Sequence, residues 1–110
     1  MIQAVLRLLD HWQADDPTSC RILNIEHSRL QTWREGTVGD CEDELTTRLM
    51  ILLHIHARLR VMFTDPKRSY AWVSRPNDLF RGQTPLELIS QHGLQGLIRV
   101  MDYLDAEAGS

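Results

Sequence analysis

Apolar residues recur every three to four positions along nearly the whole chain, the spacing at which side chains line one face of an α-helix. In residues 2–9, for example, Ile2, Val5, Leu6 and Leu9 share one such face. No stretch shows the strict alternation of apolar and polar residues that a half-buried strand requires. The pattern therefore predicts an all-α protein, with helices over residues 2–14, 17–23, 26–35, 41–63, 66–73, 85–92 and from 94 onward. Asp16 and Asp65, each directly before a proline, are expected to begin the helices over 17–23 and 66–73.

The predicted helix over 41–63 is the longest and most apolar element. It would measure about 34 Å at 1.5 Å per residue, and its first turn is acidic, which suits the positive end of the helix dipole. Asp40 is placed to cap it. Apolar positions cover more than half of its circumference, so we expect it to be the central strut of the fold. Two stripes make up this surface: the first contains Leu45, Leu49, Leu52, His56, Leu59 and Phe63, and the second contains Met50, Leu53, Ala57 and Val61.

The stretch SRPNDLFRGQTPLEL (74–88) predicts a sharp elbow between short helices. The residue before a proline is disfavoured in helical conformation, so Arg75 ends the preceding helix. Asn77 is expected to cap a single turn that stops at Gly82. Thr84 and Glu87 then form a capping box, with proline at the first helical position. The large apolar residues around the elbow are expected in the core: Trp72, Leu79, Phe80, Leu86 and Leu88.

Residues 18–36 have the layout of a helix-turn-helix. A short helix ends at Leu23, Asn24 suits the left-handed turn position, and a second helix follows. The side chains expected on its outer face could contact bases and phosphates: His27, Ser28, Arg29, Thr32 and Arg34. The same pattern also fits a plain helical scaffold without a DNA role, because Glu26 and Glu35 would repel phosphates.

The net charge and the two cysteines narrow the classes of protein to which this chain could belong. The formal charge is −3, so any DNA contact must rest on a local patch rather than on an overall basic surface. Cys20 and Cys41 stand alone, as reduced thiols of a cytoplasmic protein would. The apolar run 49–57 is interrupted by two histidines and is too short for a membrane span, and the first residues do not resemble a signal peptide. The expected location is the cytoplasm, without membrane contact.

Catalytic and metal-binding patterns are not found in the sequence. His54 and His56 lie two apart and so face different sides of a helix, whereas a metal pair needs positions i and i+4. No glycine-rich phosphate loop and no nucleophile elbow occur. We therefore expect no metal site, no cofactor and no enzymatic activity.

The C-terminal third resembles the toxin-binding domain of the Xre/MbcA/ParS antitoxin family. The resemblance covers about 40 residues and rests on a tryptophan, a Pro-Asn pair, a glycine, a Pro-Leu helix start and an aliphatic last helix. In this sequence the matching residues are Trp72, Pro76, Asn77, Leu79, Gly82, Pro85, Leu86, Leu88, Val100 and Leu104. The upstream helices match the family's helix-turn-helix region more loosely, and that region is shortened here.

The resemblance implies an antitoxin that covers the cleft of a RES-domain toxin, an NAD-consuming or ADP-ribosyltransferase-like protein. It also implies a homodimer that binds its own operator DNA. Residues 1–63 would then dimerise and could contact DNA, while residues 64–110 would bind toxin. An alternative is a free-standing helix-turn-helix regulator of transcription whose C-terminal part only dimerises.

Two groups of residues are candidates for toxin contact. Arg75 and Arg81 flank the elbow, although an ordinary solvated charge is the simpler interpretation of each. The second group is an acidic and aromatic C-terminal end that could occupy an arginine-lined toxin cleft, or could simply be a frayed, solubilising tail. Its members are Asp102, Tyr103, Asp105 and Glu107.

Overall fold

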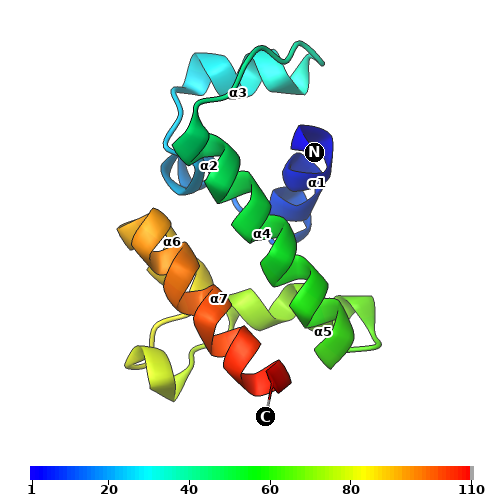
Figure 1. Cartoon of the computed structure of the whole chain (residues 1–110), viewed down its shortest axis with the longest axis vertical. Helices are drawn as coiled ribbons and strands as arrows, with labels where there is room; N and C mark the ends of the chain where they lie inside the picture. Colours follow the sequence, from blue (N-terminus) through cyan, green and yellow to red (C-terminus); the bar gives the residue numbers. More distant parts are fainter. Residues whose placement is uncertain (110) are drawn as a thin grey trace.

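The computed structural model describes residues 1–109, and within them every regular element is helical, which confirms the all-α prediction. Two single 3₁₀ turns, η1 and η2, form the elbow (Figure 1). The elements are α1 (Ile2–His11), α2 (Asp16–Leu23), α3 (His27–Arg34), α4 (Asp43–Met62), α5 (Pro66–Ala71), η1 (Trp72–Ser74), η2 (Asp78–Phe80), α6 (Pro85–His92) and α7 (Leu94–Gly109).

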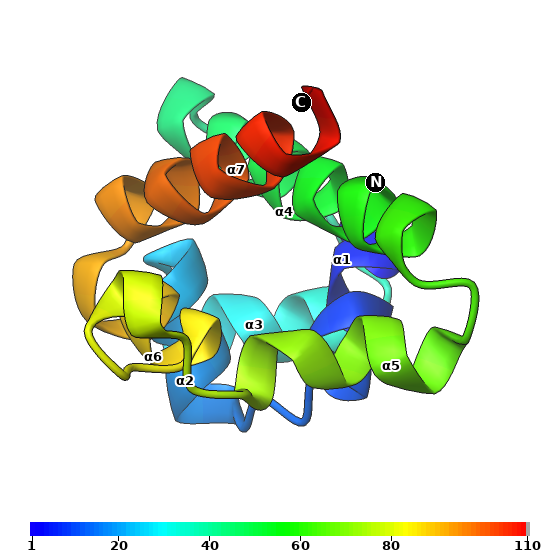
Figure 2. The same ribbon diagram turned by 90° about the horizontal axis from the view of Figure 1, so that it is seen from below.

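Helix α4 is the strut around which the other helices pack. It runs diagonally through the molecule in Figure 1, with α7 along one flank and α1 and α5 along the other. Seen from below in Figure 2, α4 and α7 form an upper layer, and α1, α2, α3, α5 and α6 lie beneath it. The two long helices therefore form one outer face of the molecule.

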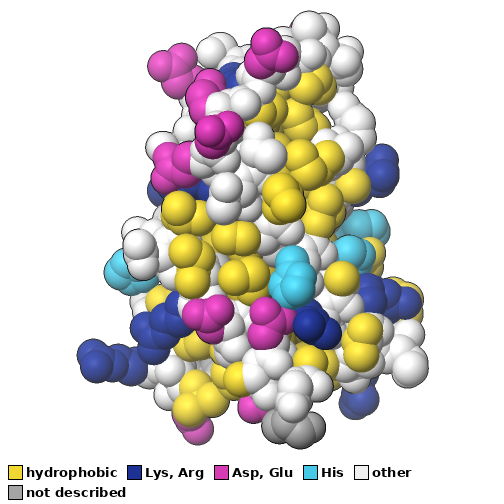
Figure 3. Space-filling model, in the orientation of Figure 1, with side chains coloured by type: hydrophobic (Ala, Val, Ile, Leu, Met, Phe, Trp, Pro, Cys, Tyr) yellow, Lys and Arg dark blue, Asp and Glu magenta, His cyan; other side chains and the backbone are white. Residues whose placement is uncertain are grey.

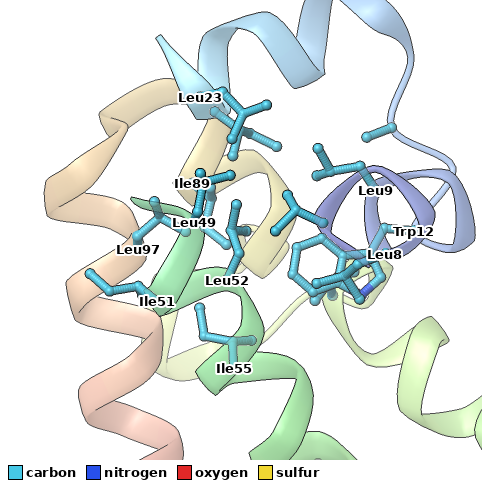
Figure 4. Packing of buried hydrophobic residues seen from close by; sticks show 14 of the residues in the cluster. Leu8, Leu9, Trp12, Leu23, Leu49, Ile51, Leu52, Ile55, Ile89 and Leu97 are labelled. Atoms are coloured by element: carbon cyan, nitrogen blue, oxygen red, sulfur yellow. The ribbon is translucent and has the colours of Figure 1, made fainter. Parts of the chain in front are cut away.

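The core lies between α4 and the lower layer. Leu49, Leu52 and Ile55 of α4 are completely buried, and Figure 4 shows Leu52 between Ile89 of α6 and Trp12, the residue that follows α1. Each such side chain contributes about 1.5–3 kcal/mol when it is fully removed from water. Residues of the N-terminal and C-terminal halves thus share one hydrophobic core.

The first predicted stripe of α4 is largely buried, but the second is not. Met50 keeps 60% and Val61 75% of their surface exposed, and Ala57 is exposed as well. Arg48 and Ile51 are buried in their place. The sequence of a helix that is apolar over most of its circumference does not reveal which flank its neighbours will cover, and here they leave the second stripe largely exposed. Helix α7 packs on the flank that carries Ile51.

Arg48 is a buried cation that hydrophobic periodicity did not single out. It is 7% exposed, and its Nη1 donates to the carbonyl oxygen of Ile22, in the last turn of α2, over 2.9 Å. Its Nη2 donates to Glu44 Oε1 over 3.3 Å. A Cβ atom on Gly93 would lie 3.0 Å from Nη1, so the guanidinium also fills the space beside the α6–α7 junction. One side chain therefore connects α2, α4 and that junction.

Helices α6 and α7 approach each other closely at Gly96. A Cβ atom at this position would lie 2.5 Å from the carbonyl oxygen of Leu88 and 3.0 Å from the Cα of Ile89. Both atoms belong to the backbone of α6 and cannot rotate away. The close crossing of the two helices therefore requires a residue without a side chain at position 96.

Two predicted helix starts are confirmed in detail. The Asp65 carboxylate accepts from the backbone N–H of Lys67 over 3.0 Å. Thr84 Oγ1 accepts from the N–H of Glu87, and the Glu87 carboxylate accepts from the N–H of Thr84, both over 3.0 Å. The hydrogen bond from the Thr84 N–H lowers the pKa of Glu87 below its ordinary value.

Two other predicted caps are wrong by one or more residues. Asp15, not Asp16, caps α2 by accepting from the Thr18 N–H over 2.9 Å. Asp40 lies ahead of α4, which begins only at Asp43. Adjacent acidic residues are equivalent in a propensity argument, and the turn that precedes each helix decides which of them reaches the free N–H groups.

Candidate protein-docking site

The elbow is a rigid turn because Asn77 closes it with both its side chain and its backbone. The Asn77 side chain accepts from the Leu79 N–H over 2.9 Å, which confirms the predicted cap. Its backbone N–H donates to Gln83, and its carbonyl oxygen accepts from the Gly82 N–H, both over 3.0 Å. Arg81 and Gly82 adopt left-handed backbone with φ of 57° and 80°. The turn from 77 to 83 is therefore closed on itself.

Aromatic packing fixes the elbow on α7. Phe80 is buried and meets Tyr103 edge to face, with ring centroids 5.5 Å apart. Trp72 stacks on the same tyrosine at 6.0 Å. Arg99 of α7 lies over the Phe80 ring and donates to the Leu79 carbonyl oxygen over 3.2 Å. Sequence periodicity could not identify Arg99, because its partners lie about twenty positions away and become neighbours only in the fold.

Leu79 is 62% exposed, so its predicted place in the core is wrong. In the single turn of η2, consecutive side chains point in different directions, and Phe80 takes the inward one. Of the other predicted core residues, Leu88 is buried, whereas Trp72 and Leu86 are half-buried. Arg75 and Arg81 are exposed on either side of Leu79 in the sequence. An apolar side chain therefore projects from a rigid turn that is flanked by two cations.

A groove of about 390 Å³ lies beside the elbow, between α6 and α7. Arg99 belongs both to this groove and to the elbow, and Asp102 adds the one carboxylate of the lining. Buried Leu88 and Gly96 form part of its wall. The complete lining consists of Leu88, His92, Gln95, Gly96, Ile98, Arg99 and Asp102. We call this groove, together with Arg75, Leu79 and Arg81, the elbow surface.

The acidic C-terminal end is helical and partly engaged within the molecule. Helix α7 continues through Gly109, so the expected loose end is not found within residues 1–109. Asp105 Oδ1 lies 2.7 Å from His54 Nε2 and accepts from Arg58 Nε over 2.8 Å. These hydrogen bonds, with that from His54 the larger influence, lower the pKa of Asp105. Asp102 and Glu107 lie exposed on the helix, and Tyr103 is held between aromatic rings.

Replacing Asp105 with Asn is expected to lower the melting temperature at neutral pH but not in strong acid. Because the pKa of Asp105 is lower in the folded than in the unfolded protein, its ionised carboxylate stabilises the folded state at pH values above the ordinary pKa of 3.8. This contribution is lost as the pH falls through the lowered pKa. Thermal unfolding followed by circular dichroism from pH 7 to about pH 2 measures it. Asp102→Asn, exposed on the same helix, is the control. An Asp105→Asn effect of constant size at every pH would contradict the expectation.

Helices α2 and α3 form as predicted, with Asn24 left-handed between them at φ 55°. Their proposed DNA-contacting side chains, however, are largely engaged with neighbours. Arg29 pairs with Glu42 at 3.0 Å and donates to the Asp40 carbonyl oxygen. Arg34 pairs with Asp16 at 2.8 Å.

The three polar members of this group have local partners or lie exposed. His27 and Thr32 contact residues four positions away on α3, Gln31 and Ser28 respectively. The exposed side chains around them include Glu26 and Glu35. The five residues therefore share a helix but do not present a free basic face, and their role in DNA binding stays a prediction.

The histidines and the longer helices of residues 1–109 bear on metal binding and membrane crossing. No group of three or more His, Cys, Asp or Glu side chains could hold a metal ion there. His54 faces Asp105, whereas His56 stacks near Tyr70, so the two histidines do point in different directions. None of the helices in this part of the chain is sufficiently long and apolar to cross a membrane.

Comparison with known proteins places the elbow surface in a described domain. Residues 58–109 match the family model of the antitoxin Xre/MbcA/ParS C-terminal toxin-binding domain. The uncharacterized protein y4oB of Sinorhizobium fredii (strain NBRC 101917 / NGR234) is 30% identical over 109 residues, which cover 98% of this chain and 84% of that protein. The matched domain contains the whole elbow, α6 and α7, and the chain belongs to the Xre/MbcA/ParS antitoxin family.

Proposed function

We propose that this protein neutralises a RES-domain toxin and that the elbow surface is the part that binds it. The single observation that carries the contact assignment is Leu79, a leucine held 62% exposed on a turn that is itself closed by hydrogen bonds. A large apolar side chain on a rigid support loses little conformational entropy on binding. An aliphatic anchor that enters a pocket of the partner, surrounded by a polar rim, is one arrangement that forms the centre of a binding interface.

The charges around Leu79 and the adjoining groove indicate what the toxin surface should contain. Arg75 and Arg81 are exposed, and neither forms a side-chain hydrogen bond or ion pair within residues 1–109. They are thus available to carboxylates of the partner. The groove between α6 and α7 would accept an apolar side chain of the toxin, with Arg99 and Asp102 at its rim. Asp105 is less suited to this role, because contact with the toxin would first break its bonds to His54 and Arg58.

Leu79→Asp is expected to weaken toxin binding about 30-fold, or about 2 kcal/mol. The substitution replaces an apolar anchor by a charge that the interface would have to desolvate. Calorimetry measures binding to the RES-domain protein that this proposal expects an adjacent gene to encode, and growth during co-expression measures protection. Replacing both Arg75 and Arg81 with Ala should mainly slow association and make binding less sensitive to salt.

Val38→Asp is the matched control, because Val38 is also exposed (46%) but lies in the α3–α4 connection. It should bind and protect like the wild type. Full protection by Leu79→Asp with unchanged affinity would show that the elbow surface is not the toxin contact. The absence of any complex with the wild-type protein would instead contradict the toxin partner itself.

The alternative function is a regulator of transcription that acts without a toxin, and repression of its own operon could also accompany the antitoxin role. The turn at Asn24 between α2 and α3 supports DNA binding, whereas the ion pairs of Arg29 and Arg34 do not. A gel shift of its own upstream region by the protein alone, without a toxin gene nearby, would favour the regulator.

A further inference from the structure

A pocket of about 350 Å³ lies between the end of α1 and the segment formed by α5 and η1. This volume falls at the lower end of the range of roughly 300–1,000 Å³ that is usual for ligand sites. We call it the α1–α5 pocket and define it by six of the residues that line it: His11, Trp12, Gln13, Lys67, Tyr70 and Ser74. The two segments are far apart in the sequence, so only the folded chain brings these side chains together.

The exposed side chains of the α1–α5 pocket can all donate hydrogen bonds, and none is a carboxylate. They are an imidazole, an amide, an ammonium group and a hydroxyl, from His11, Gln13, Lys67 and Ser74. None of the four forms a side-chain hydrogen bond or ion pair within residues 1–109. The neighbouring acids in the sequence are engaged elsewhere, because Asp10 lies 3.6 Å from Arg34 and Asp65 accepts from the backbone N–H of Lys67. The pocket therefore offers donors that lack an acceptor.

The surroundings of the pocket are cationic, although the whole chain is acidic. In other parts of the molecule Arg29, Arg34 and Arg58 each pair with a carboxylate. In Figure 3, Lys, Arg and His side chains lie along the right-hand edge, where Figure 1 places α1, α5 and the end of α4. The acidic side chains in this view lie at the centre and on the left. Four cations of these three helices have no hydrogen-bonded or ion-paired side chain within residues 1–109: Arg7, Arg60, Lys67 and Arg68.

Aromatic rings form much of the remaining wall of the pocket. His11 stacks on Tyr70 with ring centroids 4.2 Å apart and planes 10° apart. His56 of α4 is also nearly parallel to Tyr70, at 5.7 Å and 7°. Trp12 adds an indole that is only 2% exposed. A flat ring can pack against such a wall while a polar substituent stays at the exposed donors.

The indole N–H of Trp12 is a buried donor without a partner. Its Nε1 atom has no hydrogen bond within residues 1–109. Buried indole N–H groups usually find an acceptor, so an exception calls for an explanation. Because Trp12 lines the α1–α5 pocket, an oxygen atom of a bound molecule could supply this acceptor.

We propose that the α1–α5 pocket binds a small aromatic molecule that carries one phosphate or carboxylate group. The anionic group pairs with Lys67 and accepts from His11, and the ring packs against Tyr70. A cationic ligand would meet Lys67 without a carboxylate to offset it, and a purely apolar ligand would cover donors that water now hydrates. The inference does not depend on toxin binding, because the pocket shares no residue with the elbow surface.

An NMR titration of the full chain with four small molecules separates the ring from the charge. Phenyl phosphate and benzoate carry both, benzyl alcohol carries only the ring, and inorganic phosphate carries only the charge. We expect at least one of the two aromatic anions to bind with a Kd below about 1 mM, about tenfold or more tighter than benzyl alcohol and inorganic phosphate. The tighter of the two aromatic anions identifies the preferred anionic group. The indole N–H signal of Trp12 should shift, whereas that of Trp33, buried in α3 outside the pocket, should not.

Lys67→Ala should weaken binding of the preferred aromatic anion by about tenfold or more, because it removes the charged donor. Arg68→Ala is the matched control, since Arg68 is the next cation of α5 and is also exposed but does not line the pocket. It should bind like the wild type. His11→Phe keeps a ring beside Tyr70 but removes the donor, so it should cause a smaller loss. Circular dichroism should remain unchanged for all three variants.

Three results would each overturn the proposal. Equal affinity for inorganic phosphate and phenyl phosphate would indicate a simple anion site without a place for a ring. Equal losses from Lys67→Ala and Arg68→Ala would indicate attraction to the overall charge of α5. Failure of both aromatic anions to bind at millimolar concentrations, or binding that leaves the Trp12 signal in place, would show that the pocket is not their site. A failed Leu79→Asp experiment would leave this inference untouched.

Discussion

Arg48→Ala is expected to lower the free energy of unfolding by about 3 kcal/mol, and the melting temperature by on the order of 10–20 °C. The substitution would leave the Ile22 carbonyl oxygen without its side-chain donor in a region closed to water. It would also empty the space that the guanidinium fills beside Gly93. An unsatisfied buried acceptor and a cavity each destabilise by one to a few kcal/mol, which together give the stated size.

Urea unfolding of Arg48→Ala and Arg48→Lys shows how much of the stability depends on the positive charge at position 48 and how much on the hydrogen-bonding geometry of the guanidinium. Lys retains the positive charge but offers a single ammonium group instead of a planar fork, so it cannot fully replace the bonds to Ile22 and Glu44. We therefore expect Arg48→Lys to lower the free energy of unfolding, but by less than Arg48→Ala does. Arg29→Ala removes an arginine from an exposed ion pair with Glu42 and should cost less than about 1 kcal/mol. Equal stability of Arg48→Ala and wild type would show that the buried guanidinium is not a structural link.

Gly96→Val is expected to lower the free energy of unfolding by about 4 kcal/mol. Its Cβ would lie 2.5 Å from the Leu88 carbonyl oxygen, so α6 and α7 must move apart. Because the clash is with backbone, a change of rotamer cannot relieve it. The shift would also deform the groove of the elbow surface, to whose wall both residues contribute. Toxin affinity should therefore fall even under conditions in which the variant remains folded.

Gly109→Val is the matched control, since a Cβ at Gly109 has no atom within 4 Å. It should change stability by less than about 0.5 kcal/mol. Calorimetric melting of both variants makes the comparison, and chemical shifts of Leu88 report on the groove. If Gly96→Val unfolded no more readily than Gly109→Val, the close helix crossing would be wrong.

The local features of the C-terminal third could be predicted from sequence because they depend on neighbours in the chain. The capping box of Thr84 and Glu87, the Asn77 cap and the break before Pro76 all follow from residues within a few positions of one another. The family resemblance drew on the same signals, and the matched domain confirmed it. The position of the elbow was therefore predictable.

The features that depend on packing could not be predicted. Which of Leu79 and Phe80 turns inward is decided by Tyr103, more than twenty positions away. The burial of Arg48 depends on the end of α2, and the pairing of Asp105 depends on α4. Periodicity describes one helix at a time, whereas the docking site is defined by which flanks of several helices remain uncovered.

The closed turn at Asn77 and the unbroken course of α7 to Gly109 bear on how long a captured toxin would remain silent. A binding segment that is already folded offers a protease little of the flexible chain that proteases cleave. Degradation of the docking site would then require the shared core to open, so the lifetime of the folded domain would set the time of the toxin's release.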